Sequence, residues 1–167
     1  VIVLLNHILK LLEEHNIFLT GGGGVGKSYT TKEILRIYKS NNKNVVALGS
    51  TGISAVVLGG VSIHSFFKFG LCADFLELKA LDAKQKGKLK ELFDIIKNID
   101  LLIIDEISMV SADLMEMISL RLIQGEFKGR LMVVGDFYQL PPVKRQKDDM
   151  ALIKFNYAFD STAWYNF

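Results

Sequence analysis

The stretch Gly21-Gly22-Gly23-Gly24-Val25-Gly26-Lys27-Ser28 decides the fold of this 167-residue chain. It matches the pattern G-x-x-x-x-G-K-[ST], in which glycines let successive backbone N–H groups point inward at phosphate oxygens. A chance glycine-rich turn is the alternative. However, the stretch follows an apolar run at 16–20 and opens a helical pattern over 26–39, as the motif requires. The sequence therefore predicts a nucleotide site at Gly22, Gly23, Gly24, Val25, Gly26, Lys27, Ser28 and Tyr29.

Two acidic residues supply the other half of this predicted site. The apolar run 101–104 ends in Asp105 and Glu106. Asp105 can hold Mg²⁺ through water, and Glu106 can polarise the water that attacks a γ-phosphate. In the cradle, Lys27 would reach the β- and γ-phosphates and the Ser28 hydroxyl would bind the Mg²⁺. Any buried strand can end in acids, so this pair is informative only together with the phosphate cradle.

Apolar runs alternate with helical patterns along the chain. We expect strands at 16–20, 45–48, 101–104 and 131–134, and helices at 1–15, 26–39, 54–58 and 111–124. Strands that are apolar throughout are typical of parallel sheets covered on both faces. The pattern predicts an α/β fold, a three-layer α/β/α P-loop domain spanning 1–167 with a mostly parallel sheet and right-handed crossovers. Ligands of such sheets gather at the carboxyl ends of the strands, where both motifs lie.

Residues 67–98 have a different composition. Lysines alternate with leucines, at Lys79, Lys84, Lys86, Lys88 and Lys90 and at Leu78, Leu81, Leu89 and Leu92. The pattern predicts one amphipathic, lysine-rich helix preceded by a loop, inserted within the domain. Such lysines more often form a solvated helix face than a binding surface.

Another group of residues follows the last predicted strand. In the run 135–142, Gln139 is an uncharged donor and acceptor that could contact a γ-phosphate or the attacking water. The run could equally be a turn that Pro141 and Pro142 terminate. The residues alone leave both interpretations open.

A further group follows the second predicted strand, at 50–55 and 62–67. Hydroxyl groups and backbone N–H groups there suit phosphate contacts, and Phe66 could stack on a base. From the residues alone, core packing of Phe66 and a satisfied His64 are the simpler interpretation.

The net charge, the cysteine content and the apolar start of the chain exclude few classes of function. A net charge of +2 neither demands nor excludes a nucleic acid partner, because a basic face can be hidden in a neutral total. Cys72 is the only cysteine, which fits a reducing, intracellular setting such as the cytoplasm. The apolar start is too short to span a membrane and lacks the basic start of a signal peptide. Because the chain begins with Val1, we expect it to be part of a longer protein.

Taken in order, these motifs resemble the Pif/RecD-like branch of superfamily-one DNA helicases. The two strings I-I-D-E-I-S-M at 103–109 and G-D-F-Y-Q-L-P-P-V at 135–143 are far more specific than the phosphate cradle alone. The other matching segments are 20–28, 50–55, 59–60, 64–66 and 158–161 with Trp164. The resemblance therefore covers nearly the whole chain.

The resemblance implies the first RecA-like ATPase domain of a motor that uses ATP and Mg²⁺ to move 5′ to 3′ along single-stranded DNA. Lys27, Glu106 and Gln139 would be its catalytic residues, with Gln139 sensing the γ-phosphate. Ser28 and Asp105 would hold the metal. A second RecA-like domain of the same protein would supply an arginine finger and the other half of the ATP cleft.

The resemblance also changes the interpretation of the segment after the second strand. It implies that Thr51, His64, Ser65 and Phe66 face single-stranded DNA rather than the core. The chain departs from the family at the glutamine that usually precedes the cradle and reads adenine, because all four glutamines here follow the cradle. Residues 121–130 follow the family's arginine-rich signature only loosely.

Two other functions remain compatible with a phosphate cradle. A P-loop phosphotransferase would need a second substrate pocket with a lid, and would leave the run 135–143 without a role. A non-catalytic, nucleotide-gated interaction module would not need the water-activating Glu106.

Overall fold

The computed structural model describes residues 2–20, 26–50, 59–135 and 155–157. Its centre is a six-stranded sheet with the order β3-β2-β4-β5-β1-β6, in which every neighbouring pair is parallel. The strands are β1 (Asn16–Thr20), β2 (Val45–Gly49), β3 (Val61–Ser62), β4 (Leu101–Asp105), β5 (Arg130–Gly135) and β6 (Phe155–Tyr157). The four strands expected from the sequence are confirmed, whereas β3 and β6 were not anticipated.

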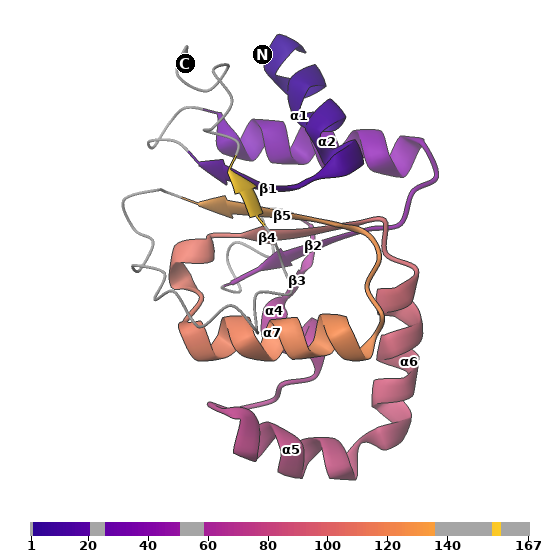
Figure 1. Ribbon diagram of the computed structural model, residues 1–167, viewed down its shortest axis with the longest axis vertical. Helices are drawn as coiled ribbons and strands as arrows, with labels where there is room; N and C mark the ends of the chain where they lie inside the picture. The colour runs from indigo at the N-terminus through magenta and orange to yellow at the C-terminus, as the bar shows by residue number, and fades with distance from the viewer. Residues whose placement is uncertain (1, 21–25, 51–58, 136–154, 158–167) are drawn as a thin grey trace.

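Helices cover both faces of the sheet, as Figure 1 shows. On one face lie α1 (Ile2–Glu14) and α2 (Lys27–Ser40). On the other lie α4 (Ile63–Phe67), α5 (Phe75–Lys84), α6 (Lys86–Lys97) and α7 (Ala112–Gln124), with the short 3-10 turn η1 (Ile107–Met109) leading into α7. The three-layer α/β/α prediction is therefore confirmed. The expected helix at 54–58 and the Pro141-Pro142 turn lie outside the described residues.

Alternate residues of the central strands feed two separate cores. In β4, Leu102 and Ile104 belong to the cluster beneath α4–α7, while Leu101 and Ile103 belong to the cluster beneath α1 and α2. All four side chains are fully buried. Burial on both faces is the reason that the strands are apolar throughout rather than alternating.

The prediction of a single helix within 67–98 is wrong, because the structure has two helices that meet at Gln85. The Gln85 side chain donates hydrogen bonds to the carbonyl of Lys68 (2.9 Å) and to Asp82 Oδ1 (3.1 Å), and its backbone φ and ψ are −126° and 32°. These tertiary contacts break a pattern that is locally helical on both sides. Among the described helices, none is both long and apolar enough to cross a membrane.

Candidate nucleotide-binding site

The predicted motifs meet at the carboxyl edge of the sheet. The strands β1, β5 and β4 are consecutive neighbours, and they end at Thr20, Gly135 and Asp105. Thr20 is in register with Gly135, and Asp105 with Gly49 of β2. Parallel pairing thus brings together the ends of three strands that are spread over 115 positions of the sequence, from Thr20 to Gly135. This is the edge at which open parallel sheets bind ligands.

The start of α2 provides the described half of the phosphate cradle. Gly26 has φ +83°, a left-handed conformation that favours glycine, and Lys27 is the first residue of the helix. The hydroxyl of Thr30 donates to the Gly26 carbonyl (3.0 Å), and that of Thr31 donates to the Lys27 carbonyl (2.8 Å). These bonds fix the first turn, and the N–H groups at the start of a helix suit an anion.

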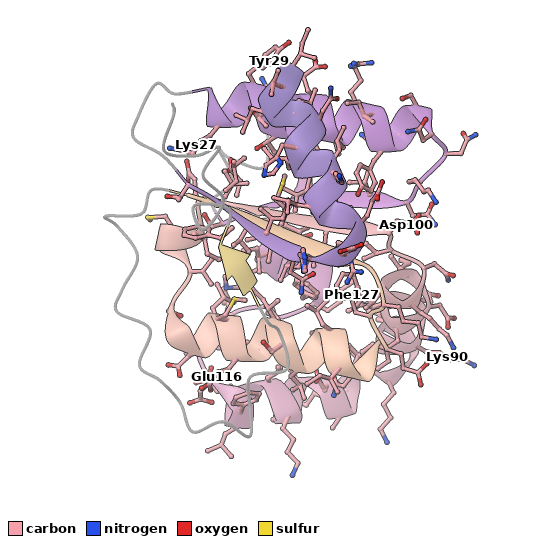
Figure 2. The ribbon with its side chains drawn as sticks, turned by 45° about the horizontal axis from the view of Figure 1, so that its top comes forward. Lys27, Tyr29, Lys90, Asp100, Glu116 and Phe127 are labelled. Carbon is pink, nitrogen blue, oxygen red and sulfur yellow. The ribbon has the colours of Figure 1, made fainter. Side chains whose placement is uncertain are left out.

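Lys27 and Ser28 are the first two residues of α2. Figure 2 shows Lys27 on the side of the molecule toward which the strands point. Ser28 is exposed at the same helix start. Tyr29 is 56% exposed and lies on the outer side of the helix layer in Figure 2. Gly22, Gly23, Gly24, Val25, Thr51 and Gln139 lie outside the described residues.

Asp105 is half-buried at the end of β4. Burial raises the pKa of its carboxyl group, while the Glu106 N–H bond to Oδ1 (2.9 Å) and the charge of Lys27 act in the opposite direction. The ammonium of Lys27 therefore lies near enough to Asp105 for their charges to interact across β5. A bound divalent cation would favour the charged carboxylate further.

The donor set at this edge fits Mg²⁺. The Ser28 hydroxyl and the Asp105 carboxylate are hard oxygen ligands, and Mg²⁺ is usually held by one or two such groups together with phosphates and water. Within the described residues, no group of three or more His, Cys, Asp or Glu side chains could hold a metal alone. The site thus suits a metal that arrives with phosphate.

Glu106 occupies an unusual backbone conformation. Its φ and ψ are both 52°, which is uncommon for a residue with a side chain and costs of order 1 kcal/mol or more. The Ser50 hydroxyl donates to its carbonyl (3.0 Å), and so does the Met109 N–H (3.0 Å). The exposed Glu106 side chain is thus held at the edge by β2 and η1. We expected the Ser50 hydroxyl to suit a phosphate, but here it positions Glu106.

Gly135 lets η1 approach the end of β5. A methyl group at Gly135 would lie 2.8 Å from Ile107 Cγ2, closer than real Cβ contacts allow. The turn that follows Glu106 therefore packs directly on the strand that leads into the 135–143 run.

The segment after β3 presents polar groups on a capped turn. Ser62 caps α4 by accepting a hydrogen bond from the Ser65 N–H (3.2 Å), and His64 and Ser65 are exposed. Phe66 is half-buried, and its ring meets the buried Phe67 ring edge-on at 4.9 Å. Phe66 thus has both a packed face and an accessible one, so the simple core interpretation describes it only partly.

Arg121 is a residue that the sequence did not reveal. Its side chain is fully buried and donates to both Asp82 carboxylate oxygens (2.7 Å each), to the Phe67 carbonyl (2.9 Å) and to Gln124 Oε1 (3.1 Å). It therefore ties α7 to α4 and α5. The loose match of residues 121–130 to the family's arginine-rich signature was the signal in the sequence, and it did not indicate that Arg121 is buried.

Comparisons with known proteins place these features in a family. The family model described as PIF1-like helicase matches residues 3–167. Over 157 residues the chain is 49% identical to the ATP-dependent DNA helicase Pif1 of Campylobacter jejuni, covering 93% of this chain and 35% of that protein.

Solved structures agree. The Pif1 helicase from Candida albicans has a TM-score of 0.68 and 34% identity, covering 83% of this chain and 33% of that one. The Bacteroides Pif1 helicase in complex with ADP-AlF3 and ssDNA has a TM-score of 0.63 and 29% identity, covering 88% and 34%. The chain thus spans about a third of the length of these relatives.

Proposed function

Because this chain belongs to the PIF1-like helicase family, we propose that it is the ATP-binding domain of an ATP-dependent DNA helicase. Its RecA-like fold places Lys27 and Asp105 at one edge of the sheet, where the charge of Lys27 acts on the Asp105 carboxyl group, and this arrangement carries the proposal. Neither a P-loop phosphotransferase nor a nucleotide-gated module accounts for the family match over the whole chain.

ATP binds where α2 begins. Backbone N–H groups of 22–29 hold the phosphates, and Lys27 neutralises charge on the β- and γ-phosphates. Ser28 and Asp105 would hold Mg²⁺, which would neutralise negative charge on the phosphates. Glu106 orients the water and accepts its proton. Gln139, four residues after β5 ends, senses the γ-phosphate.

ATP hydrolysis is coupled to movement through a second domain. ATP closes the cleft between the two RecA-like domains, and hydrolysis reopens it. Single-stranded DNA held across both domains is then moved stepwise, 5′ to 3′. On this domain the DNA contacts are Thr51, His64, Ser65 and Phe66. The crystallised Bacteroides relative holds both ADP-AlF3 and ssDNA, which supports a nucleotide site and a DNA site in one protein.

The isolated 167 residues are expected to bind nucleotide but not to act as a motor. An arginine finger is worth roughly 10³–10⁵ in rate in related phosphoryl transfer, and the proposal places it on the second domain. The check is to measure ATPase activity, with and without single-stranded DNA, for these residues alone and for a longer protein that contains them. Unwinding of a tailed duplex by the 167 residues alone would contradict the two-domain mechanism.

Phe66→Ala is expected to weaken binding of single-stranded DNA by about 1–3 kcal/mol, the value of one aromatic–base stack. Its effect on the melting temperature should be smaller than that of Phe67→Ala, because Phe67 is fully buried and truncating a buried Phe costs about 3–5 kcal/mol. Fluorescence anisotropy at low salt and thermal unfolding measure the two effects.

The exposed neighbours provide the control for this experiment. His64→Ala and Ser65→Ala should leave the melting temperature unchanged and reduce DNA affinity. If Phe66→Ala destabilised the fold as much as Phe67→Ala, and neither exposed variant altered DNA affinity, the segment would belong to the core alone.

A further inference from the structure

The junction of α5 and α6 concentrates positive charge. Four lysines occur within seven residues, and we call them the lysine elbow: Lys84, Lys86, Lys88 and Lys90. All four are exposed. Among the described residues, none of the four forms an ion pair. The charge of the elbow is therefore available to a partner.

The elbow carries more than the whole net charge of the chain. It contains four of the 20 basic residues and none of the 18 acidic ones, and the chain as a whole is only +2. The other residues together are therefore slightly acidic. Glu91 is the first acid after the run. This asymmetry makes the elbow a distinct electrostatic feature rather than part of a generally basic surface.

Buried contacts hold the elbow in place. Asp82 is the nearest acid before it, but its two carboxylate oxygens accept hydrogen bonds from the buried Arg121. Gln85, at the bend, donates to the Lys68 carbonyl. On α6 the residues Leu89, Leu92 and Ile96 are buried in the core. The fold thus neutralises the carboxylate that precedes the elbow and fixes the backbone that carries the lysines.

The lysines project outward from this fixed backbone. Lys86 and Lys90 are four residues apart on α6, so their side chains share one helix face about 5–6 Å apart at Cβ. Figure 2 shows Lys90 extending away from the rest of the molecule. The elbow therefore offers a row of cations to a ligand with regularly spaced negative charges.

We propose that the lysine elbow is a second nucleic-acid contact, which binds the phosphate backbone of double-stranded DNA. The proposal rests on the proposed function, because a helicase must meet a duplex. A duplex carries one negative charge per about 1.7 Å of axis and keeps its bases stacked, so cations alone can bind it. Single strands are usually held by aromatic stacking, and residues 84–92 contain no aromatic side chain.

The test replaces the four elbow lysines by glutamine in the 167-residue chain. The matched control replaces Lys10, Lys32, Lys39 and Lys43, which are also exposed but lie outside the elbow, on α1, α2 and the turn after it. Binding of a blunt duplex and of oligothymidine is measured without nucleotide, as a function of salt concentration.

The elbow variant is expected to lose duplex affinity and salt dependence. Four phosphate contacts contribute about 3–4 to the slope of log K against log salt, which corresponds to roughly a hundredfold change in affinity between about 50 and 200 mM salt. The elbow variant should lack most of that dependence, while the control variant retains it. The loss should be smaller for oligothymidine.

Three outcomes would overturn the proposal: unchanged duplex binding by the elbow variant, an equal loss in the control variant, or an equal loss for oligothymidine. Calorimetry with ADP separates this question from the proposed function. If the unmodified chain does not bind ADP, the proposed function fails. If both variants bind ADP like the unmodified chain but duplex binding is unaltered, only the elbow proposal fails.

Discussion

Lys27→Ala is expected to weaken the binding of ATP by roughly 10²-fold or more, and that of ADP, which lacks the γ-phosphate, by roughly tenfold or more. Hydrogen bonds to charged groups are worth about 1.5–3 kcal/mol each, and Lys27 is proposed to contact two phosphates. Its charge also acts on the Asp105 carboxyl group, so its removal takes one positive charge away from the edge that is proposed to bind the phosphates. Isothermal titration calorimetry of the 167-residue chain in Mg²⁺ measures the change directly.

Lys32→Ala is the matched control for this experiment. Lys32 lies on the same helix, five residues further on, and is exposed. Its removal should change neither nucleotide affinity nor melting temperature. Equal ADP binding by the unmodified chain and Lys27→Ala would contradict the proposed phosphate site, provided that both proteins are folded.

Arg121→Ala is expected to destabilise the fold by about 3–5 kcal/mol, as does removal of one partner from other buried ion pairs. The guanidinium is fully buried. Its loss leaves the Asp82 carboxylate, with 17% of its side chain exposed, and the Phe67 carbonyl without their hydrogen bonds. For a chain of this length the melting temperature should fall by about 6–20 °C. Thermal and urea unfolding measure the effect.

Lys97→Ala provides the contrast. Lys97 and Glu126 form an exposed ion pair at 3.2 Å, and exposed pairs contribute about 0–1 kcal/mol. A similar small loss for Arg121→Ala would mean that the buried pair does not hold α7 to α4 and α5.

The stability contributed by Asp82 should depend on pH. Burial alone would raise the pKa of Asp82, but hydrogen bonds from Arg121 and Gln85 lower it below the usual value of 3.8. A group with a lowered folded-state pKa stabilises the fold above its unfolded pKa, and that contribution is lost as pH falls through the folded value. The difference in unfolding free energy between the unmodified chain and Asp82→Asn should therefore shrink below about pH 4.

Local signals in the sequence predicted most elements that position the nucleotide site. The apolar run before the glycines is β1, and Ser111 caps α7 by accepting a hydrogen bond from the Leu114 N–H. Such elements are predictable because a cap, a glycine turn or a buried strand depends on residues close together in the chain. The placement of Lys27 and Asp105 at one edge followed from a general rule of parallel sheets rather than from any local pattern.

Elements that depend on distant partners were not predictable. The two-residue strand β3 exists because Val61 and Ser62 pair with β2. The helix expected over 67–98 is divided because Gln85 bonds to Lys68, seventeen residues away. Neither contact can be recognised from the spacing of apolar residues within the segment.

The sequence by itself determined the sheet class and predicted the phosphate-cradle motif, because residue type and spacing within about ten positions specify them. Only the tertiary structure decided which distant residues hold α4, α5 and α7 together and fix the backbone of Glu106. Arg121 reaches Asp82 and Phe67 across 39 and 54 residues, and Ser50 reaches Glu106 across 56. A buried charge needs hydrogen-bond or ion-pair partners, because an unpaired charge in the core costs several kcal/mol. Those partners can come from any part of the sequence that folding places beside it. Such pairs therefore become visible only in the folded structure.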